Sequence, residues 1–290
     1  MVATLASLLL AAVLAWHTAR PIRALRAAFA AAAGGDLNAR FGANQRARGD
    51  ELFELGREFD RMSLQLRVLM DKRQRLLHDV SHELRAPLAR LHAALGLAQQ
   101  QPEKQAQWLQ RIEREGERME KLVGELLTLS RLDTATNLPV AKEVLVLELI
   151  AAIVTDALFE AVSKGCKVSI TGCPSAKVRG APDLLCRAID NVVRNAIKHS
   201  SPGGTVGIDL RVEGDKLVIS VLDDGPGVPA VHLSAIFLPL FRSDPGASDM
   251  DGHGLGLAIA LRAVEAHGGA IKAGNRECGG LCVTVALPVA

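Results

Sequence analysis

The chain has 290 residues, enough for a globular domain together with an extended helical region. Its formal net charge is only +2, and the sequence contains neither a clustered basic stripe nor a helix-turn-helix signature, so no nucleic-acid partner is expected. The five cysteines are odd in number and form no CxxC pair, which predicts reduced thiols in a cytosolic domain.

The first segment, from Val2 to Trp16, is apolar apart from two hydroxyl side chains. The arginines of this region all come after the segment, from Arg20 onward. A signal peptide would carry its positive charge before the apolar run, so we predict a transmembrane helix over residues 1–18. The positive-inside rule then places the remainder in the cytoplasm, held at the inner (cytoplasmic) membrane by a single span. A buried or artefactual N-terminus is the alternative.

Two short apolar seams with coiled-coil spacing follow. Pro21 opens the first, Gly34 to Leu37 interrupts it, and a linker runs to Gly49, just before Asp50-Glu51 and the second seam. An ordinary dimeric coiled coil would have the same spacing. The seam positions are Ile22, Leu25, Phe29 and Ala32, and then Leu52, Leu55, Phe59, Met62, Leu66 and Leu69.

The spacing changes where the second seam meets the next helical stretch. Extending the seam predicts apolar residues at positions 73 and 87, but Arg73 and Pro87 stand there, so the register shifts before His82. We hypothesise that this shift passes on a rotation or bending of the upper helices.

This next stretch carries a reactive side chain on its polar face. Its apolar positions are Leu77, Val80, Leu84, Leu88, Leu91 and Leu95. His82 lies two residues from two of them, so at about 100° per residue its imidazole points away from the apolar face. Glu83 follows directly, and Pro87 predicts a kink because it removes a helical N–H. Two other interpretations are a solvated His82–Glu83 surface pair and a metal pair of His78 and His82, which have metal-ligand spacing.

A helical hairpin is predicted next. The polar run Gln99–Glu103 marks its loop, and a linker runs from Leu132 to Pro139 after its second helix. One hairpin cannot cover both of its apolar faces, whereas two hairpins from two chains form a four-helix bundle, so we predict a homodimer. The apolar face of the second helix is made of Trp108, Ile112, Met119, Leu122, Leu126 and Leu129.

Helices and β-rich runs then alternate. This pattern predicts an α/β two-layer sandwich that follows the helical region. Helices are expected over Val146–Lys164, Pro182–His199 and Gly254–His267, and strands over Lys167–Thr171, Lys177–Arg179, Thr205–Val212, Lys216–Asp223, Ala270–Ala273 and Leu281–Leu287.

Four segments of this domain have residues suited to a nucleotide. Asn191, Asn195 and Lys198 share one helix face, where amide oxygens suit Mg²⁺ and the lysine suits phosphate. Asp223 to Gly227 ends a strand, with an acceptor for an adenine amino group and with Gly225 and Gly227 allowing close backbone approach. Taken alone, the first segment is equally consistent with a solvated helix face and the second with a simple turn.

The third and fourth segments lie further along the chain. Arg242 follows a phenylalanine pair, Phe237 and Phe241, that would otherwise indicate only core packing. The glycines of Gly252-His253-Gly254-Leu255-Gly256 open a helix whose free N–H groups favour a triphosphate. We interpret residues 243–251 between them as a flexible lid. No GxxxxGK[ST] sequence occurs, which excludes P-loop ATPases.

These motifs resemble those of the sensor histidine kinases of two-component systems. The stretch around His82 is similar to their phospho-acceptor box, the two seams to a HAMP linker, and the four segments, in order, to their Bergerat-type ATP-binding fold. The resemblance implies domains at 19–71 (HAMP), 72–134 (dimerisation and phospho-acceptor hairpin) and 140–290 (ATP-binding).

The resemblance also implies roles. His82 would take the γ-phosphoryl group of ATP while Glu83 accepts its other ring proton, and an Asp of a response-regulator receiver domain would receive the group. Asn195 would bind Mg²⁺, and Asp223 would bind adenine. The remaining nucleotide-binding residues would be Asn191, Lys198, Gly225, Gly227, Arg242, Gly252, Gly254 and Gly256.

The chain departs from the family at two positions. Ala86 stands four residues after the acceptor, where Thr or Asn commonly positions a water for dephosphorylating the partner, so we expect weak phosphatase activity. His199 replaces the usual aromatic residue after Lys198. The alternatives are a regulator phosphatase, which Ala86 argues against; a non-catalytic membrane scaffold, which intact nucleotide motifs argue against; and a heat-shock or mismatch-repair type ATPase, which has no use for a His-Glu helix.

Overall fold

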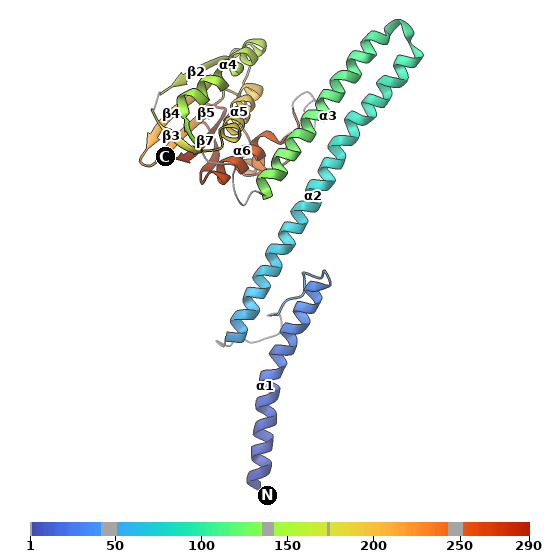
Figure 1. Cartoon of the computed structure of the whole chain (residues 1–290), viewed down its shortest axis with the longest axis vertical. Coiled ribbons are helices and arrows are strands. Elements are labelled where there is room, and N and C mark those ends of the chain that lie inside the picture. The colour runs from blue at the N-terminus through green and yellow to red at the C-terminus, as the bar shows by residue number, and fades with distance from the viewer. Residues whose placement is uncertain (1, 42–50, 135–141, 173–174, 243–251) are drawn as a thin grey trace. The chain divides into compact units, whose positions relative to one another are not determined.

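The computed structural model describes residues 2–41, 51–134, 142–172, 175–242 and 252–290, and the chain divides into two compact units, Met1–Asp79 and Val80–Ala290. Its first half is helical, with α1 at Val2–Ala33, α2 at Glu51–Gln100 and α3 at Gln105–Thr134 (Figure 1). An α/β domain follows.

α1 runs through Pro21 and ends at Ala33. Gly35 then adopts a φ of 93°, a left-handed conformation that glycine tolerates, and this confirms the predicted break in the first seam. The remainder of the predicted linker, 42–50, lies outside the described residues. Among the helices that the structure describes, none combines the length and hydropathy needed to cross a membrane, so the span over residues 1–18 stays a prediction.

A small apolar cluster holds the first unit together. Leu25 and Ala28 of α1 are buried with Phe41 and Phe59. The Phe41 ring lies directly on Gly56 of α2, where an added Cβ would come within 1.8 Å of it. The sequence expectation left Phe41 in the linker, so this contact was not predicted.

Most of the predicted seam positions in this unit are exposed in the single chain. Leu25 and Phe59 are the buried ones. Coiled-coil seams are covered by a second helix, so this exposure agrees with the predicted homodimer. The exposed seam positions are Ile22, Phe29, Leu55, Met62, Leu66 and Leu69.

The predicted hairpin is confirmed. α2 continues without interruption through the buried Pro87, the 3₁₀ helix η2 (Pro102–Lys104) makes the turn, and α3 returns antiparallel to α2 (Figure 1). On the predicted face of α3, Leu122 and Leu129 are buried and the other four positions are half-buried. Other apolar side chains of the hairpin remain exposed, as a surface for a second hairpin would be: Leu77, Leu88, Leu95, Leu109, Val123 and Leu127.

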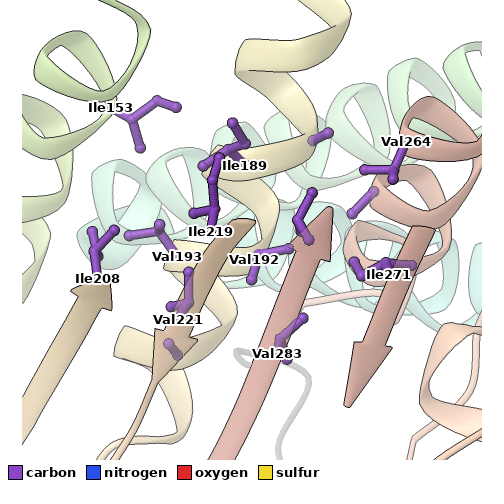
Figure 2. Close-up of a cluster of buried hydrophobic side chains, with 14 of the residues drawn as sticks. Ile153, Ile189, Val192, Val193, Ile208, Ile219, Val221, Val264, Ile271 and Val283 are labelled. Atoms are coloured by element: carbon purple, nitrogen blue, oxygen red, sulfur yellow. The ribbon is translucent and has the colours of Figure 1, made fainter. Parts of the chain in front are cut away.

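The α/β domain has the predicted two layers. Its five-stranded sheet has the order β2-β4-β5-β7-β6, in which β2 and β4 are parallel and the other pairs antiparallel. Helices cover one face, and their apolar side chains meet those of the sheet (Figure 2). The elements are α4 (Val146–Lys164), β2 (Lys167–Thr171), β3 (Lys177–Gly180), α5 (Pro182–His199), β4 (Thr205–Glu213), β5 (Lys216–Leu222), α6 (Gly256–Ala266), β6 (Ala270–Asn275) and β7 (Leu281–Pro288).

Apart from strand ends that differ by one or two residues, two elements differ from expectation. A further strand, β1 (Lys142–Leu145), pairs antiparallel with β3 and was not predicted. α6 begins at Gly256 rather than at Gly254, because Gly254 has a φ of 69° and cannot be part of a right-handed helix.

α5 places the first candidate segment. Its buried side chains recur at helical spacing and face the sheet, which leaves the polar side chains on the other face. Pro182 stands in its first turn, where its missing N–H is not needed. The buried positions are Leu185, Ala188, Ile189, Val192, Val193, Ala196 and Ile197.

Candidate functional site

Asn191, Asn195 and Lys198 are all half-buried on α5, as their spacing predicted. The side-chain nitrogen Nδ2 of Asn191 is buried and makes no hydrogen bond to any described residue. A buried amide without a partner is costly, by about 1–3 kcal/mol. This nitrogen is therefore a donor that a ligand can satisfy.

The glycine segment that opens α6 adjoins this face of α5. A Cβ at Gly256 would lie 3.4 Å from Oδ1 of Asn191, and one at Gly252 would lie 3.9 Å from Nζ of Lys198. The first helical N–H groups of α6 carry no side-chain cap. Free N–H groups beside a lysine form a site for phosphate oxygens.

The loop after β5 reaches the C-terminal end of α5. Asp223 is 3% exposed, and its Oδ1 accepts hydrogen bonds from the N–H groups of Gly225 at 2.9 Å and Leu281 at 3.1 Å. At Gly225 an added Cβ would come within 2.4 Å of the carbonyl oxygen of His199. Glycine is thus required where the loop crosses the end of α5.

Asp224, next in this loop, is exposed but strongly held. Its Oδ2 accepts from the N–H of Thr205 at 2.9 Å and its Oδ1 from Nη1 of Arg276 at 2.7 Å. These two hydrogen bonds hold the pKa of the Asp224 carboxyl below its usual range, and the one from Thr205 has the larger effect.

The third segment packs on the fourth. The N–H of Leu240 donates to the carbonyl of Gly254 at 3.0 Å, and a Cβ at Gly254 would lie 2.7 Å from the carbonyl oxygen of Phe241. Leu240 has a φ of 61°, an unfavourable conformation for a branched side chain that this packing maintains. The predicted lid, 243–251, lies outside the described residues.

The structure therefore brings the four segments to one end of the α/β domain. Contacts join Asn191 and Lys198 to the glycine segment, the end of α5 to the Asp223 loop, and the glycine segment to the phenylalanine segment. Gly227, with a φ of 73°, faces Asn275 instead, where an added Cβ would lie 2.9 Å from Oδ1.

His82 is exposed on α2, as predicted, and Glu83 beside it is half-buried. Both line a cavity of about 50 Å³. This volume holds a few water molecules but not a nucleotide. The other lining residues are Ala86, Pro87, Arg90, Arg118, Arg242, Gly252 and His253.

Sequence reasoning missed a buried charge next to this cavity. Glu115 of α3 is 1% exposed, and its carboxylate lies 3.1 Å from Nε of Arg90 and 3.0 Å from Nη1 of Arg118. Glu115 stands three residues after Ile112 and four before Met119, on the predicted apolar face. A charge at helical spacing within an apolar stripe was the signal that could have found it.

Family models match most of the chain. The histidine kinase-, DNA gyrase B- and HSP90-like ATPase family matches residues 180–290. The His Kinase A (phospho-acceptor) domain matches residues 72–135, and the HAMP domain matches residues 13–68.

Curated relatives align along the chain. The sensor histidine kinase CpxA of Escherichia coli (strain K12) is 35% identical over 278 residues, which cover 95% of this chain and 60% of CpxA. The sensor protein PfeS of Pseudomonas aeruginosa is 38% identical over 291 residues, covering 100% of this chain and 64% of PfeS. The chain thus spans less than two thirds of the length of either relative.

Solved structures share the architecture. Full-length ShkA in complex with AMPPNP is 26% identical with a TM-score of 0.56, over 75% of this chain and 46% of ShkA. The histidine kinase AdeS of Acinetobacter baumannii, 19% identical with a TM-score of 0.57 over 71% of this chain and 97% of AdeS, shares the fold.

Proposed function

Because this chain belongs to the sensor histidine kinases of two-component systems, we propose that it is an ATP-dependent protein-histidine kinase that phosphorylates itself at His82. The observation that carries the proposal is the convergence of four nucleotide-type segments at one end of the α/β domain, together with an exposed imidazole on the hairpin. The solved complex of the related ShkA with AMPPNP supports nucleotide binding.

The residues present fit ATP. Asp223 has a fixed carboxylate for the adenine amino group, and Gly225 and Gly227 let its loop lie against the end of α5 and against Asn275. The unsatisfied nitrogen of Asn191, the Lys198 ammonium and the first N–H groups of α6 supply donors for phosphate oxygens. Gly252 and Gly256 let that helix end approach Lys198 and Asn191, and Gly254 lets it pack on the phenylalanine segment.

The donor set also fits Mg²⁺. The Asn195 side chain offers one hard oxygen ligand, and Mg²⁺ in phosphotransferases takes few protein ligands because phosphates and water complete its shell. In the part of the chain that the structure describes, no group of three or more His, Cys, Asp or Glu side chains could hold a metal ion by itself. We therefore assign Asn195 as the metal ligand that acts together with the nucleotide.

His82 and Glu83 perform the transfer. When bound, ATP with Mg²⁺ supplies an activated γ-phosphoryl group. One ring nitrogen of His82 would attack the γ-phosphorus while the bond to the β–γ bridging oxygen breaks and ADP leaves. The Glu83 carboxylate would hold the other ring nitrogen and accept its proton. Arg242 and Lys198 balance negative charge on the phosphates.

The partners follow from the family. We propose a homodimer through the hairpin, in which the exposed apolar side chains of α2 and α3 are covered by a second copy. An Asp on a response-regulator receiver domain then takes the phosphoryl group from His82. We further propose that the first 18 residues hold the protein at the inner membrane and that the catalytic region lies in the cytoplasm.

Phosphatase activity toward the regulator is proposed to be weak. Ala86 is exposed four residues after His82 and lines the cavity beside it. Its methyl group can neither donate nor accept a hydrogen bond, so it cannot orient a water molecule for attack on a phosphoaspartate.

The test is incorporation of label from γ-labelled ATP into the full chain. We expect label that is lost in acid and retained in base, as phosphohistidine requires, and none in His82→Gln. Label that is stable in acid, or that persists in His82→Gln, contradicts the proposal.

A further inference from the structure

We propose that Asn275 and Arg276, at the end of β6, are positioning residues that hold the Asp223 loop in the geometry that selects adenine over guanine. The inference rests on the proposed nucleotide site and adds residues that none of its four segments contains. It concerns the loop from Asp223 to Val228, called the base loop below.

The orientation of the Asp223 carboxylate depends on backbone groups alone. Its Oδ1 is held by the N–H groups of Gly225 and Leu281, and the N–H of Asp223 donates to the carbonyl of Leu281 at 3.0 Å. Within the described part of the chain, no hydrogen bond reaches Oδ2 of Asp223. Oδ2 is thus the acceptor left for a ligand, and its direction is fixed only as well as the backbone around it.

Arg276 fixes the start of the base loop. Its Nη1 donates to the carbonyl oxygen of Asp223 at 2.6 Å and to Oδ1 of Asp224 at 2.7 Å. Asp224 in turn accepts from the N–H of Thr205 on β4. One guanidinium thereby joins the base loop to the turn between β6 and β7, and the charge of Asp224 strengthens the link.

Asn275 fixes the other end of the loop. Its Oδ1 accepts from the N–H of Val228 at 2.9 Å and its Nδ2 donates to the carbonyl of Val228 at 2.6 Å. This two-point contact copies a pair of β-ladder hydrogen bonds. Two adjacent residues therefore clamp a loop that lies about 50 positions earlier in the chain.

Glycine makes the close approach of the clamp possible. At Gly280 an added Cβ would come within 1.9 Å of the carbonyl oxygen of Asp223, and the φ of 90° there favours glycine. The carbonyl of Gly280 also accepts from the N–H of Arg276 at 3.0 Å. The turn is thus built to bring Arg276 against the base loop.

Base selection follows from hydrogen-bond polarity. Adenine presents an amino donor where guanine presents a carbonyl acceptor, so a correctly placed carboxylate attracts the first and repels the second. If the clamp is released, the carboxylate moves out of position and the favourable contact with adenine weakens. Guanine gains nothing comparable, so selectivity falls.

The experiment measures the affinity of the full chain for ATP and for GTP by calorimetry. Wild type is expected to prefer ATP, and Arg276→Gln to bind ATP about tenfold more weakly with GTP affinity nearly unchanged, so that the ratio falls about tenfold. Arg276→Lys, which keeps one charged donor, should recover part of the ratio. The matched control is Arg211→Gln on β4, since Arg211 has two acidic partners, Asp209 and Glu213, on the same sheet and none in the base loop.

If Arg276 had a purely structural role, Arg276→Gln would lower the affinity for ATP and GTP equally or lower only the melting temperature. Either result overturns the inference. If Arg276→Gln does not fold, the ratio in Asn275→Ser decides in the same way. Wild type that binds ATP no better than GTP, or binds neither, overturns the proposed site itself. Wild type that prefers ATP, with both variants equally selective, overturns only the clamp.

Discussion

Among the residues that the structure describes, the hairpin and the α/β domain each have one fully buried carboxylate, and the two are stabilised in different ways. Glu115, 1% exposed, lies between the guanidinium groups of Arg90 and Arg118. Asp223, 3% exposed, has only backbone N–H groups on Oδ1, and its partner Arg276 contacts its carbonyl oxygen rather than its carboxylate.

This difference separates a structural charge from the charge that we propose binds the nucleotide. Glu115 has a guanidinium on each oxygen and almost no exposed surface, so it has no room for a ligand and joins α2 to α3. Asp223 is oriented but keeps acceptor capacity, as a recognition site requires. The same change of acid to amide at the two positions should therefore have opposite consequences.

The largest expected effect is that of Asp223→Asn on nucleotide affinity. The amide oxygen can keep both backbone hydrogen bonds, so the fold should remain, but an NH₂ group then faces the adenine amino group. We expect ATP affinity to fall about 100-fold, the value of a hydrogen bond to a charged group. Titration calorimetry and the melting temperature without ligand measure the two effects, and a large drop in melting temperature with little loss of ATP affinity would contradict the assignment.

Glu115→Gln should lower the stability of the fold and leave ATP affinity unchanged. The amide leaves two guanidinium groups without an opposing charge, and because both are partly exposed we expect a loss of about 2 kcal/mol rather than the full value of a buried pair. The melting temperature of the full chain should fall by about 5 °C while ATP affinity is unchanged. The exposed Glu117, two residues away, gives the control Glu117→Gln. An unchanged melting temperature for Glu115→Gln would show that the pair does not join the helices.

Ala86→Thr changes the hairpin beside His82 and tests the proposed weak phosphatase activity. A hydroxyl beside His82 can orient a water molecule, so we expect dephosphorylation of the phosphorylated regulator to accelerate about tenfold. This is less than general acid–base catalysis supplies, because the hydroxyl orients the water without taking its proton. ATP affinity should stay constant because none of the proposed nucleotide-binding residues is changed. The measurement is the rate of label loss from the regulator, with Ala86→Ser as a second variant. Rapid loss of label from the regulator with wild type would contradict the proposed weak phosphatase activity.

The smallest effect concerns pH. Burial raises the pKa of Glu125 on α3, although Lys121 and Arg187 act in the opposite direction. The folded state therefore holds this proton more tightly than the unfolded state, and stability is lost as the pH rises from about 4.5 through the raised pKa. Glu125→Gln should be relatively more stable than wild type at pH 7 than at pH 4, as melting temperatures at both values would show. A difference in melting temperature between Glu125→Gln and wild type that is the same at both pH values would contradict this prediction. Glu120→Gln, at an exposed position, is the control.

Much of the fold was predictable because local signals agreed. α4 and α5 begin and end where expected, since Gly165 ends the first with a φ of 73° and Pro182 opens the second. The missed strand β1 has only four residues, and its pairing with β3 is long-range, so periodicity carries no sign of it.

The site was predictable where its residues form local motifs. The four nucleotide segments are short sequence patterns, and the structure brings them together. The clamp of Asn275 and Arg276 was not predictable, because it acts on residues about 50 positions away and no local pattern distinguishes it from a turn. Glu115 was missed because it stands among the exposed Glu113, Glu117 and Glu120 of α3, where a glutamate has the local pattern of a solvated residue.

The most direct test compares ATP binding and label transfer in wild type, Asp223→Asn and His82→Gln of the full chain. The account predicts that wild type binds ATP and becomes labelled, that Asp223→Asn does neither at an ATP concentration that saturates wild type, and that His82→Gln binds with wild-type affinity but takes no label. If His82→Gln is still labelled, or Asp223→Asn binds ATP as wild type does, the assignment of acceptor and base-recognition residues is wrong.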